Sequence, residues 1–332
     1  MPIFPGVISG SGRIPISASL SSSGTVTINV STFDNLNITV SATGGTGIYT
    51  YTLHNAPSGF VVGDPGGYGY IAIYGHTRTA GTYSNVYVTV TDSRGKSANT
   101  NAITLQINNI TYTANTIIAG AGGGGGANVN AAGGGAGGFL AQSRSVTTNT
   151  TYSFSVGAGG AAGSNGGTTT WNVSAVATGG LAGGTTGGTG GSTGTPSSVS
   201  ATIPHTGGSG STTTAGGGGG GYSSNGGNAS ANTGGNGGSG TSSNYAGPIT
   251  YYCYGGNGVG NTYNGNNGDP ATSANTPGCG GNAKSAGTNG QIVISIPSYI
   301  GGYTYTGTAP LVTTNGSYTV FLWDSGSGTI TF

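Results

Sequence analysis

Few side chains in this 332-residue sequence could act in acid–base chemistry: it has five aspartates, three histidines and no glutamate. They are Asp34, Asp64, Asp92, Asp269, Asp324, His54, His76 and His205. Catalysis needs such groups within reach of one another, but the aspartates are scattered and mostly stand in turn sequences such as GDPGG and TDSRG, where aspartate caps its own backbone. A depolymerase with an aspartate pair is the remaining enzymatic alternative. We predict no catalytic residues and no enzyme.

The sequence shows few signs of a metal site or a cofactor site. Cys253 and Cys279 could form a disulfide in oxidising surroundings or remain buried thiols, and the sequence leaves both alternatives open. Neither histidine nor an acidic residue stands at zinc-ligand spacing from them. Runs such as GAGGGGG contain G-x-G-x-x-G, but no helical pattern follows and no Lys-Ser/Thr completes a phosphate loop. We expect no metal and no cofactor.

The tyrosines are the best candidates for a binding role. The chain has 19 of them, and the proposed receptor-binding set interrupts the glycine runs: Tyr222, Tyr245, Tyr251, Tyr252, Tyr254 and Tyr263. Aromatic rings stack on sugars and anchor protein contacts, and the loop from Asn244 to Pro270 combines Tyr, Asn and Gly as antibody paratopes do. The alternative is that these rings fill space beneath the glycine packing. Trp171 and Trp323 lie on alternating segments and are expected in the core.

The low content of charged residues limits the kinds of partner that the protein can bind. Asp, Glu, Lys and Arg together make up 3% of the chain, and the net charge is +1. Nucleic acid and anionic membranes are therefore not expected as partners. No run of eighteen apolar residues and no secretion-signal pattern is found, so we expect no membrane insertion.

About 54 of the 75 glycines fall between Gly120 and Gly290. Ordering a glycine costs roughly 0.5–1 kcal/mol more than ordering an alanine, and these residues have little apolar area to bury. Dense hydrogen bonding between backbones is the expected compensation. Polyglycine II, in which extended three-residue-per-turn strands pack side by side, is one such arrangement.

The elements around the glycines predict an all-β protein. Alternating segments and turns predict a β-sandwich over 14–108. Strand-like segments such as 151–156 and 291–296 bracket the glycine runs of a domain over 109–297. A short β-meander is expected over 298–332, where it must dock on the preceding domain or on a neighbouring subunit. Residues 1–13, which contain prolines, are expected to be an extended anchor segment.

Two resemblances accompany these patterns. The segments GGTGIYTYTLHNAPSGF and IAIYGHTRTAGTYSNVYVTVTDSRG resemble a bacterial and phage immunoglobulin-like module of the cadherin-like type, although GHTRTAGT departs from its usual GTPTTAGT. This resemblance implies a spacer or display role. The series IIAGAGGGGG, TTYSFSVGAGG and a terminal IVISI resembles the glycine-rich domain of tailed-bacteriophage fibre and surface proteins. In some phage adhesins such regions are packed as polyglycine II and carry receptor-binding loops.

The second resemblance implies a virion structural protein exposed on the particle surface, a tail fibre or adhesin that binds a host-cell glycan or outer-membrane protein. The implied partners are other virion proteins and further copies of the chain, as in a trimer. The alternative is a capsid decoration protein, a head fibre or a subunit of an extracellular filament.

Overall fold

The computed structural model describes residues 14–31, 36–186, 188, 190–191, 194, 205–211, 213–244, 250–265 and 276–332. The described chain is all-β, as predicted, and its one helical turn is the 3₁₀ turn η1 (Ser298–Ile300). It divides into two compact units, Met1–Ile110 and Thr111–Phe332. The anchor segment expected at 1–13 lies outside the described residues.

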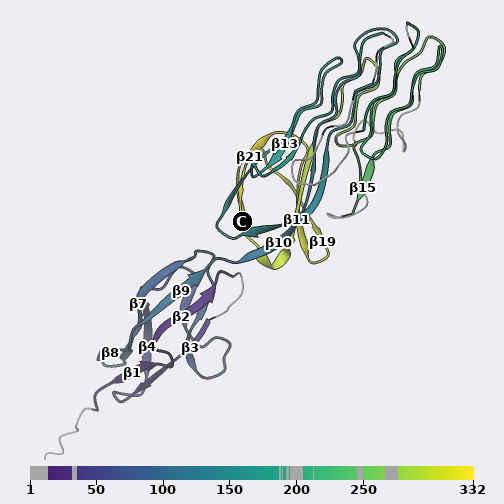
Figure 1. Cartoon of the computed structure of the whole chain (residues 1–332). Helices are drawn as coiled ribbons and strands as arrows, with labels where there is room; N and C mark the ends of the chain where they lie inside the picture. Colours follow the sequence, from purple (N-terminus) through teal and green to yellow (C-terminus); the bar gives the residue numbers. More distant parts are fainter. Residues whose placement is uncertain are drawn as a thin grey trace, which may run out of the picture. The chain divides into compact units, whose positions relative to one another are not determined.

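The first unit consists of two β-sheets that enclose one apolar core (Figure 1). One sheet has the order β1 (Ser17–Leu20), β3 (Leu36–Thr43), β6 (Ile71–Gly75) and β5 (Phe60–Gly63). The other has the order β2 (Gly24–Asn29), β9 (Ile103–Asn108), β7 (Gly81–Asp92) and β4 (Tyr49–His54), with β8 (Ser97–Asn99) paired to β7. Alternation directs Val86, Val88 and Val90 of β7 into the core. The immunoglobulin-like resemblance of this unit stays a prediction.

The second unit is built on two five-stranded sheets. The first has the order β11 (Phe139–Thr147), β10 (Thr111–Ala119), β17 (Gln291–Pro297), β20 (Tyr318–Trp323) and β19 (Leu311–Asn315). The second has the order β14 (Ala175–Ala177), β13 (Thr169–Trp171), β12 (Thr151–Ser155), β21 (Ser327–Thr331) and β18 (Thr304–Gly307). A separate hairpin pairs β15 (Thr241–Ser243) with β16 (Thr250–Tyr252). The C-terminal strands β18 to β21 are thus divided between the two larger sheets.

Aromatic rings fill the core of the second unit. Trp171 and Trp323, which were expected to be core residues, are 2% and 1% exposed, with ring centroids 6.3 Å apart. Phe154 packs on Trp323 at 4.6 Å, and Tyr152 stacks on Trp171 at 5.6 Å. Since these residues come from β12, β13 and β20, the contacts join the two sheets. Such rings bury large areas, so this core fixes the strands from which the glycine-rich segments extend.

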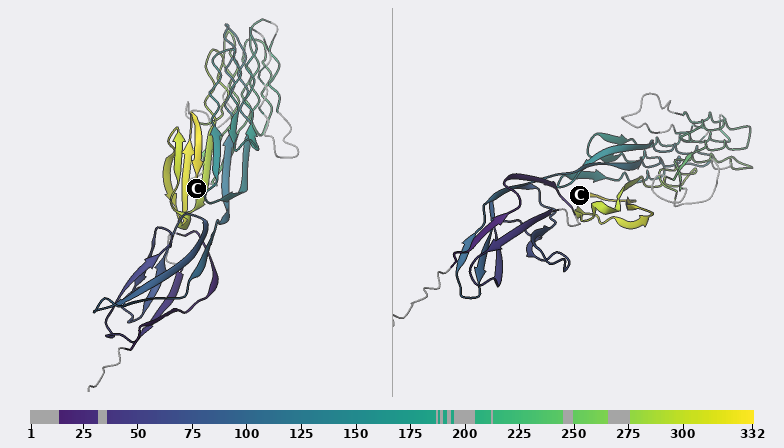
Figure 2. Two further views of the ribbon diagram at one scale, coloured as in Figure 1. Left: turned by 90° about the vertical axis from the view of Figure 1, so that its left-hand side faces the viewer. Right: turned by 90° about the horizontal axis from the view of Figure 1, so that it is seen from below.

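Glycine-rich segments, called rods below, continue several of these strands (Figure 2). The rod 120–126 follows β10, the rod 131–138 leads into β11, and the rod 285–290 leads into β17. A strand with side chains hydrogen-bonds only within its sheet, because side chains hold the next layer about 10 Å away. Where glycine replaces those residues, a further layer of backbone can approach to hydrogen-bonding distance.

The hydrogen bonds of the rods repeat every three residues. Gly122, Gly123 and Gly124 donate to Thr288, Gly135 and Ser164, each at 2.9 Å, so successive amides point to three different rods. The next amide, that of Gly125, donates to Ser285 and so returns to the rod that contains Thr288. This three-residue period is that of polyglycine II.

The three rods with the longest glycine runs are surrounded on all sides. The amides of the rod 120–126 donate to three segments, and its carbonyl groups accept from three others, so the rod has six neighbours. The carbonyl groups that accept from this rod lie in 132–138, 164–167 and 285–288. The amides that donate to it lie in 160–163, 180–183 and 281–284. The rods 131–138 and 215–221 are enclosed in the same way. The inner rods therefore satisfy their backbone almost entirely with other backbone.

Close approach, rather than backbone conformation, requires glycine in these rods. A Cβ on Gly122 would overlap the carbonyl oxygen of Cys279, and one on Gly218 would overlap that of Asn236. Neither glycine has a positive φ. A side chain at either position would push two rods apart.

On the outer rods, side chains replace missing backbone neighbours. Asn225 Oδ1 accepts from the amide of Thr206 at 3.0 Å, and three residues later Asn228 Oδ1 accepts from Ser209 at 2.8 Å. Asn165 Oδ1 likewise accepts a hydrogen bond from the amide of Ala182, at 2.8 Å. Asparagine thus satisfies amides at the surface that a further rod would satisfy in the interior.

Candidate binding surface

The rods reverse direction in turns that gather at the end away from the strands of the second unit (Figures 1 and 2). We call this set of turns the tip. It comprises residues 127–130, 162–163, 185–186, 213–214, 230–233, 261–263 and 283–285. The rods hold these turns at fixed positions, because each turn is bounded by two hydrogen-bonded segments.

Side-chain hydrogen bonds connect the turns of the tip. Asn130 Nδ2 donates to Asn261 Oδ1 at 2.5 Å, and Thr186 Oγ1 donates to the carbonyl oxygen of Val129 at 2.7 Å. Thr214 Oγ1 donates to the carbonyl oxygen of Ala231 at 2.7 Å. Turns that are far apart in sequence therefore form a connected surface.

The exposed residues of the tip are of mixed chemistry. Tyr263 is 67% exposed and Val129 is 63% exposed. Around them lie exposed Asn and Thr residues and the single charge of Lys284: Asn128, Thr185, Thr186, Asn232, Thr233, Asn261 and Thr262. Apolar anchors within neutral hydrogen-bonding groups suit recognition of a polar, uncharged partner.

The structure separates the six tyrosines of the predicted binding set. Tyr263 lies at the tip, whereas Tyr251, 46% exposed, lies on the β15–β16 hairpin near the strands. Tyr222 is half-buried and packs edge-on against Phe139 at 5.4 Å. Tyr245 lies outside the described residues.

Tyr252 and Tyr254 are buried, so they cannot contact a receptor directly. Tyr252 is 2% exposed, packs on Phe139 at 5.0 Å and donates from its hydroxyl to Gln291 Oε1 at 3.1 Å. Burial raises its pKa to about 12. Tyr254 is 9% exposed. Tyr252 packs in the cluster that contains Ile117 and Val293, and the ring of Tyr254 lies 6.4 Å from that of Tyr251, so both rings fill space as the alternative describes.

The expected contact loop, from Asn244 to Pro270, is not one surface. Its described part contains β16 near the strands, the rod 253–260 and the turn 261–263 at the tip. Val129 has no role in the sequence-based prediction, and Asn261 enters it only as part of this loop, because nothing in the local sequence shows that their turns meet.

Cys253 and Cys279 are free thiols in the structure, the second of the two alternatives, rather than a disulfide. Cys279 Sγ accepts a hydrogen bond from the amide of Tyr254 at 3.3 Å. Burial raises the pKa of Cys279 to about 12 and that of Cys253 well above its ordinary value. Both groups are therefore protonated and unreactive at neutral pH.

Two aspartates cap turns, as predicted. Asp64 accepts from the amides of Tyr68 and Gly69 at 2.8 and 2.9 Å. Asp92 accepts from those of Arg94 and Lys96 at 2.9 Å each. Their carboxylates stabilise local backbone.

The other titratable residues are also dispersed. Asp324 accepts from the hydroxyl of Ser325 at 3.3 Å, and His54 stacks on Tyr87 at 4.6 Å. Asp34 and Asp269 lie outside the described residues. In the described part of the chain, no three His, Cys, Asp or Glu side chains are grouped to hold a metal ion. No helix there has the length and apolar character needed to cross a bilayer.

Comparison with known proteins gives one match. A family model described as a glycine-rich domain matches residues 97–297, which is more than half of the chain. No curated protein and no solved structure matches.

Proposed function

The chain belongs to the glycine-rich domain family, and from that premise we propose that it is a non-enzymatic surface protein of a tailed-bacteriophage virion, a tail fibre or adhesin that binds a host-cell receptor. The receptor is a surface glycan or an outer-membrane protein. The first unit acts as a spacer, and the tip of the second unit makes the contact.

The observation that carries this proposal is the contrast between the rods and the tip. The inner rods offer almost no side chains, and their backbone groups are bonded to one another. The tip presents Tyr263, Val129 and a ring of Asn and Thr residues. A rigid scaffold that ends in exposed side chains loses little conformational entropy when those side chains bind.

The rods also explain how such a surface could vary. A turn between two rods can change in sequence without disturbing the hydrogen bonds of the rods themselves, which depend on backbone. Recognition of different receptors then requires changes at the tip alone.

Adsorption to cells tests the proposal. The purified, fluorescently labelled chain is mixed with a panel of bacterial strains, and bound protein is measured by flow cytometry. We expect saturable binding to a restricted set of strains. Periodate treatment of the cells abolishes binding to a glycan, and protease treatment abolishes binding to a protein. Absence of binding to every strain, or equal binding to all, contradicts the proposal.

The architectural alternative, a capsid decoration protein, head fibre or filament subunit, has one observation in its favour. All five residues of β19, an edge strand, are exposed. An unpaired edge can add a strand from another chain. Light scattering and the copy number per particle distinguish the two: hundreds of copies indicate decoration, and a handful, for example as a trimer, indicates a fibre.

A further inference from the structure

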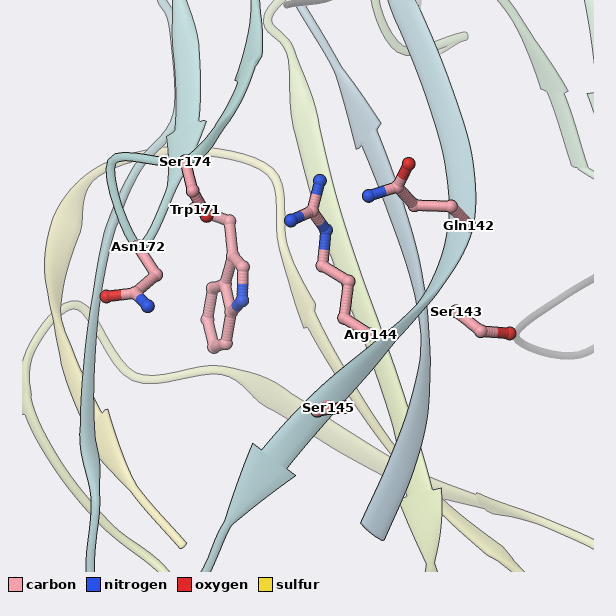
Figure 3. A pocket seen from close by; sticks show the side chains of 7 residues that line it. All are labelled: Gln142, Ser143, Arg144, Ser145, Trp171, Asn172 and Ser174. Atoms are coloured by element: carbon pink, nitrogen blue, oxygen red, sulfur yellow. The ribbon is translucent and has the colours of Figure 1, made fainter. Parts of the chain in front are cut away.

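A pocket of about 300 Å³ opens in the second unit between β11 and the turn that joins β13 to β14. Both β11 and β14 are edge strands, so the pocket lies at an open side of the two sheets. Its lining consists of Gln142, Ser143, Arg144, Ser145, Trp171, Asn172 and Ser174 (Figure 3). Arg144 supplies the only charge of this lining.

Arg144 is directed into the pocket by its position on β11. Gln142 and Arg144 are two residues apart and therefore point to the same face of the strand. Figure 3 shows the guanidinium between the amide of Gln142 and the indole of Trp171. With the amide of Gln142 turned so that its oxygen faces Arg144, that oxygen accepts from Nη2 and from Nε, the latter at 2.9 Å. Gln142 thus fixes the orientation of the charged group.

Trp171 forms the inner wall. It is 2% exposed, and because Tyr152 stacks on it with an interplanar angle of 5°, it presents its edge to the pocket. Figure 3 shows the indole nitrogen on the side that faces Arg144. Nε1 of the neighbouring Trp323 donates to the carbonyl oxygen of Thr308 at 3.1 Å, whereas Nε1 of Trp171 has no acceptor among the described residues.

The opposite rim is a tight turn. Asn172 and Val173 both have positive φ, 47° and 46°, which allows the chain to reverse between β13 and β14. The amide of Ser174 donates to the carbonyl oxygen of Asn172. The turn thereby places the amide of Asn172 and the hydroxyl of Ser174 at the pocket.

We propose that this pocket binds a single carboxylate-bearing sugar residue, with the carboxylate between the guanidinium of Arg144 and the indole N–H of Trp171. A guanidinium is a planar fork that matches a carboxylate, and the indole N–H adds a convergent donor. The sugar hydroxyls bond to the side-chain amide of Asn172 and the hydroxyl of Ser174 on the opposite rim. This site lies on the strands, so the proposal does not depend on receptor binding at the tip.

The composition and size of the lining favour such a ligand over others. The lining contains no aliphatic side chain, and an apolar ligand would bury donors and acceptors without partners. Its volume stands at the lower limit of small-molecule pockets, which suits one sugar ring. The positive charge favours an acidic sugar over a neutral one.

Calorimetry with free sugars tests the proposal on the intact chain. The probes are galacturonate, galactose, a galactose sulfate and acetate. We expect galacturonate to bind at least tenfold more tightly than galactose or acetate, and more tightly than the sulfate ester. Arg144→Gln lowers the galacturonate affinity by about tenfold to a hundredfold. Arg144→Lys keeps the charge without the fork and recovers only part of the affinity.

Lys284→Gln is the matched control. It removes one of the other five Lys and Arg charges of the sequence, and Lys284 is exposed at the tip of the same unit. Its galacturonate affinity should equal that of the unmodified chain, and the melting temperature of each variant verifies folding. No binding of galacturonate, equal binding of galactose or acetate, or retention of affinity in Arg144→Gln overturns the proposal. Because free sugars replace cells, a failure of the adhesion experiment does not affect this result.

Discussion

The amide of Gly122 donates to the carbonyl oxygen of Thr288 at 2.9 Å, although the two residues are separated by half the length of the chain. At the same position the backbone of Cys279 passes so close that a side chain would overlap it. In each inner rod the backbone N–H and C=O groups are hydrogen-bonded to other rods. There is also no space for a side chain between neighbouring rods. The stability of the second unit therefore depends on glycines that are far apart in sequence.

Replacement of Gly122 by alanine should destabilise the second unit by about 1–3 kcal/mol or more, the range for overpacking of a close-packed interior. The neighbour is backbone, which cannot turn aside as a side chain can. Gly63→Ala is the control, because a Cβ there meets only the Tyr74 ring at 3.8 Å and φ is not positive. Urea unfolding followed by circular dichroism measures both. Unfolding of the second unit at the same urea concentration in Gly122→Ala as in the unmodified chain contradicts the packing argument.

Tyr251 and Tyr252 are adjacent but should respond differently to replacement by alanine. Tyr252→Ala removes a buried ring and its bond to Gln291, at a cost of about 3–5 kcal/mol, as for other large core aromatics. Tyr251→Ala removes a ring that is 46% exposed and should change stability by less than about 0.5 kcal/mol. Similar melting temperatures for both variants would show that Tyr252 is not a core residue.

Stability should fall above about pH 9 because the pKa values of the two thiols are raised in the folded chain. The pKa of Cys279 is about 12 in the folded chain, against about 8.5 for an unfolded cysteine, and the pKa of Cys253 is raised as well. A raised folded-state pKa means that the unfolded chain loses its proton first. The contribution is complete below about pH 8.5 and is lost as the pH approaches 12. Melting temperatures between pH 7 and 11 measure the decline.

A variant with both cysteines replaced by alanine should show a smaller loss of stability at high pH than the unmodified chain. The buried tyrosines, including Tyr252 with its pKa of about 12, account for the remainder. Thiol titration gives an independent check: neither cysteine of the folded chain should react with Ellman's reagent at pH 8, and both should react in guanidinium chloride. Rapid reaction of the folded chain contradicts the raised pKa values of the two groups.

The all-β fold could be predicted from the sequence because its signals are local. Alternating residues such as those of β7 identify strands by their period, and the turn roles of Asp64 and Asp92 follow from neighbouring residues. That the glycine-rich segments are ordered could be predicted from a free-energy argument. Fixing many glycines costs conformational entropy, and only a densely hydrogen-bonded arrangement can offset that cost.

The positions of the tyrosines could not be predicted because they depend on where each rod begins and ends. Tyr251 and Tyr263 stand close in sequence, but the rod 253–260 runs between them, a distance of roughly 25 Å at about 3.1 Å per residue. Arg144 gave no sequence signal at all. Its pocket exists only because β11 and the turn after β13 lie at the same side of two sheets.

Tyr263 at the tip should be needed for adsorption to cells. Its ring is 67% exposed, and the turn that carries it is bonded to the turn of Val129 through Asn130 and Asn261. An exposed aromatic anchor of an interface contributes about 2 kcal/mol or more to binding, so Tyr263→Ala should weaken adsorption by about thirtyfold. Flow cytometry with the labelled variant over a concentration series measures the shift in half-saturation.

Tyr305→Ala provides the matched control for this change. Tyr305 lies on β18 and is 46% exposed, so its removal deletes a similar ring from the strand region of the same unit. Its adsorption curve should overlay that of the unmodified chain, and unchanged melting temperatures for both variants exclude unfolding as the cause. If Tyr305→Ala reduced adsorption and Tyr263→Ala did not, the contact surface would lie on the C-terminal strands instead of the tip. That outcome would favour the exposed edge of β18 and β19 as the part of the molecule that meets its partner.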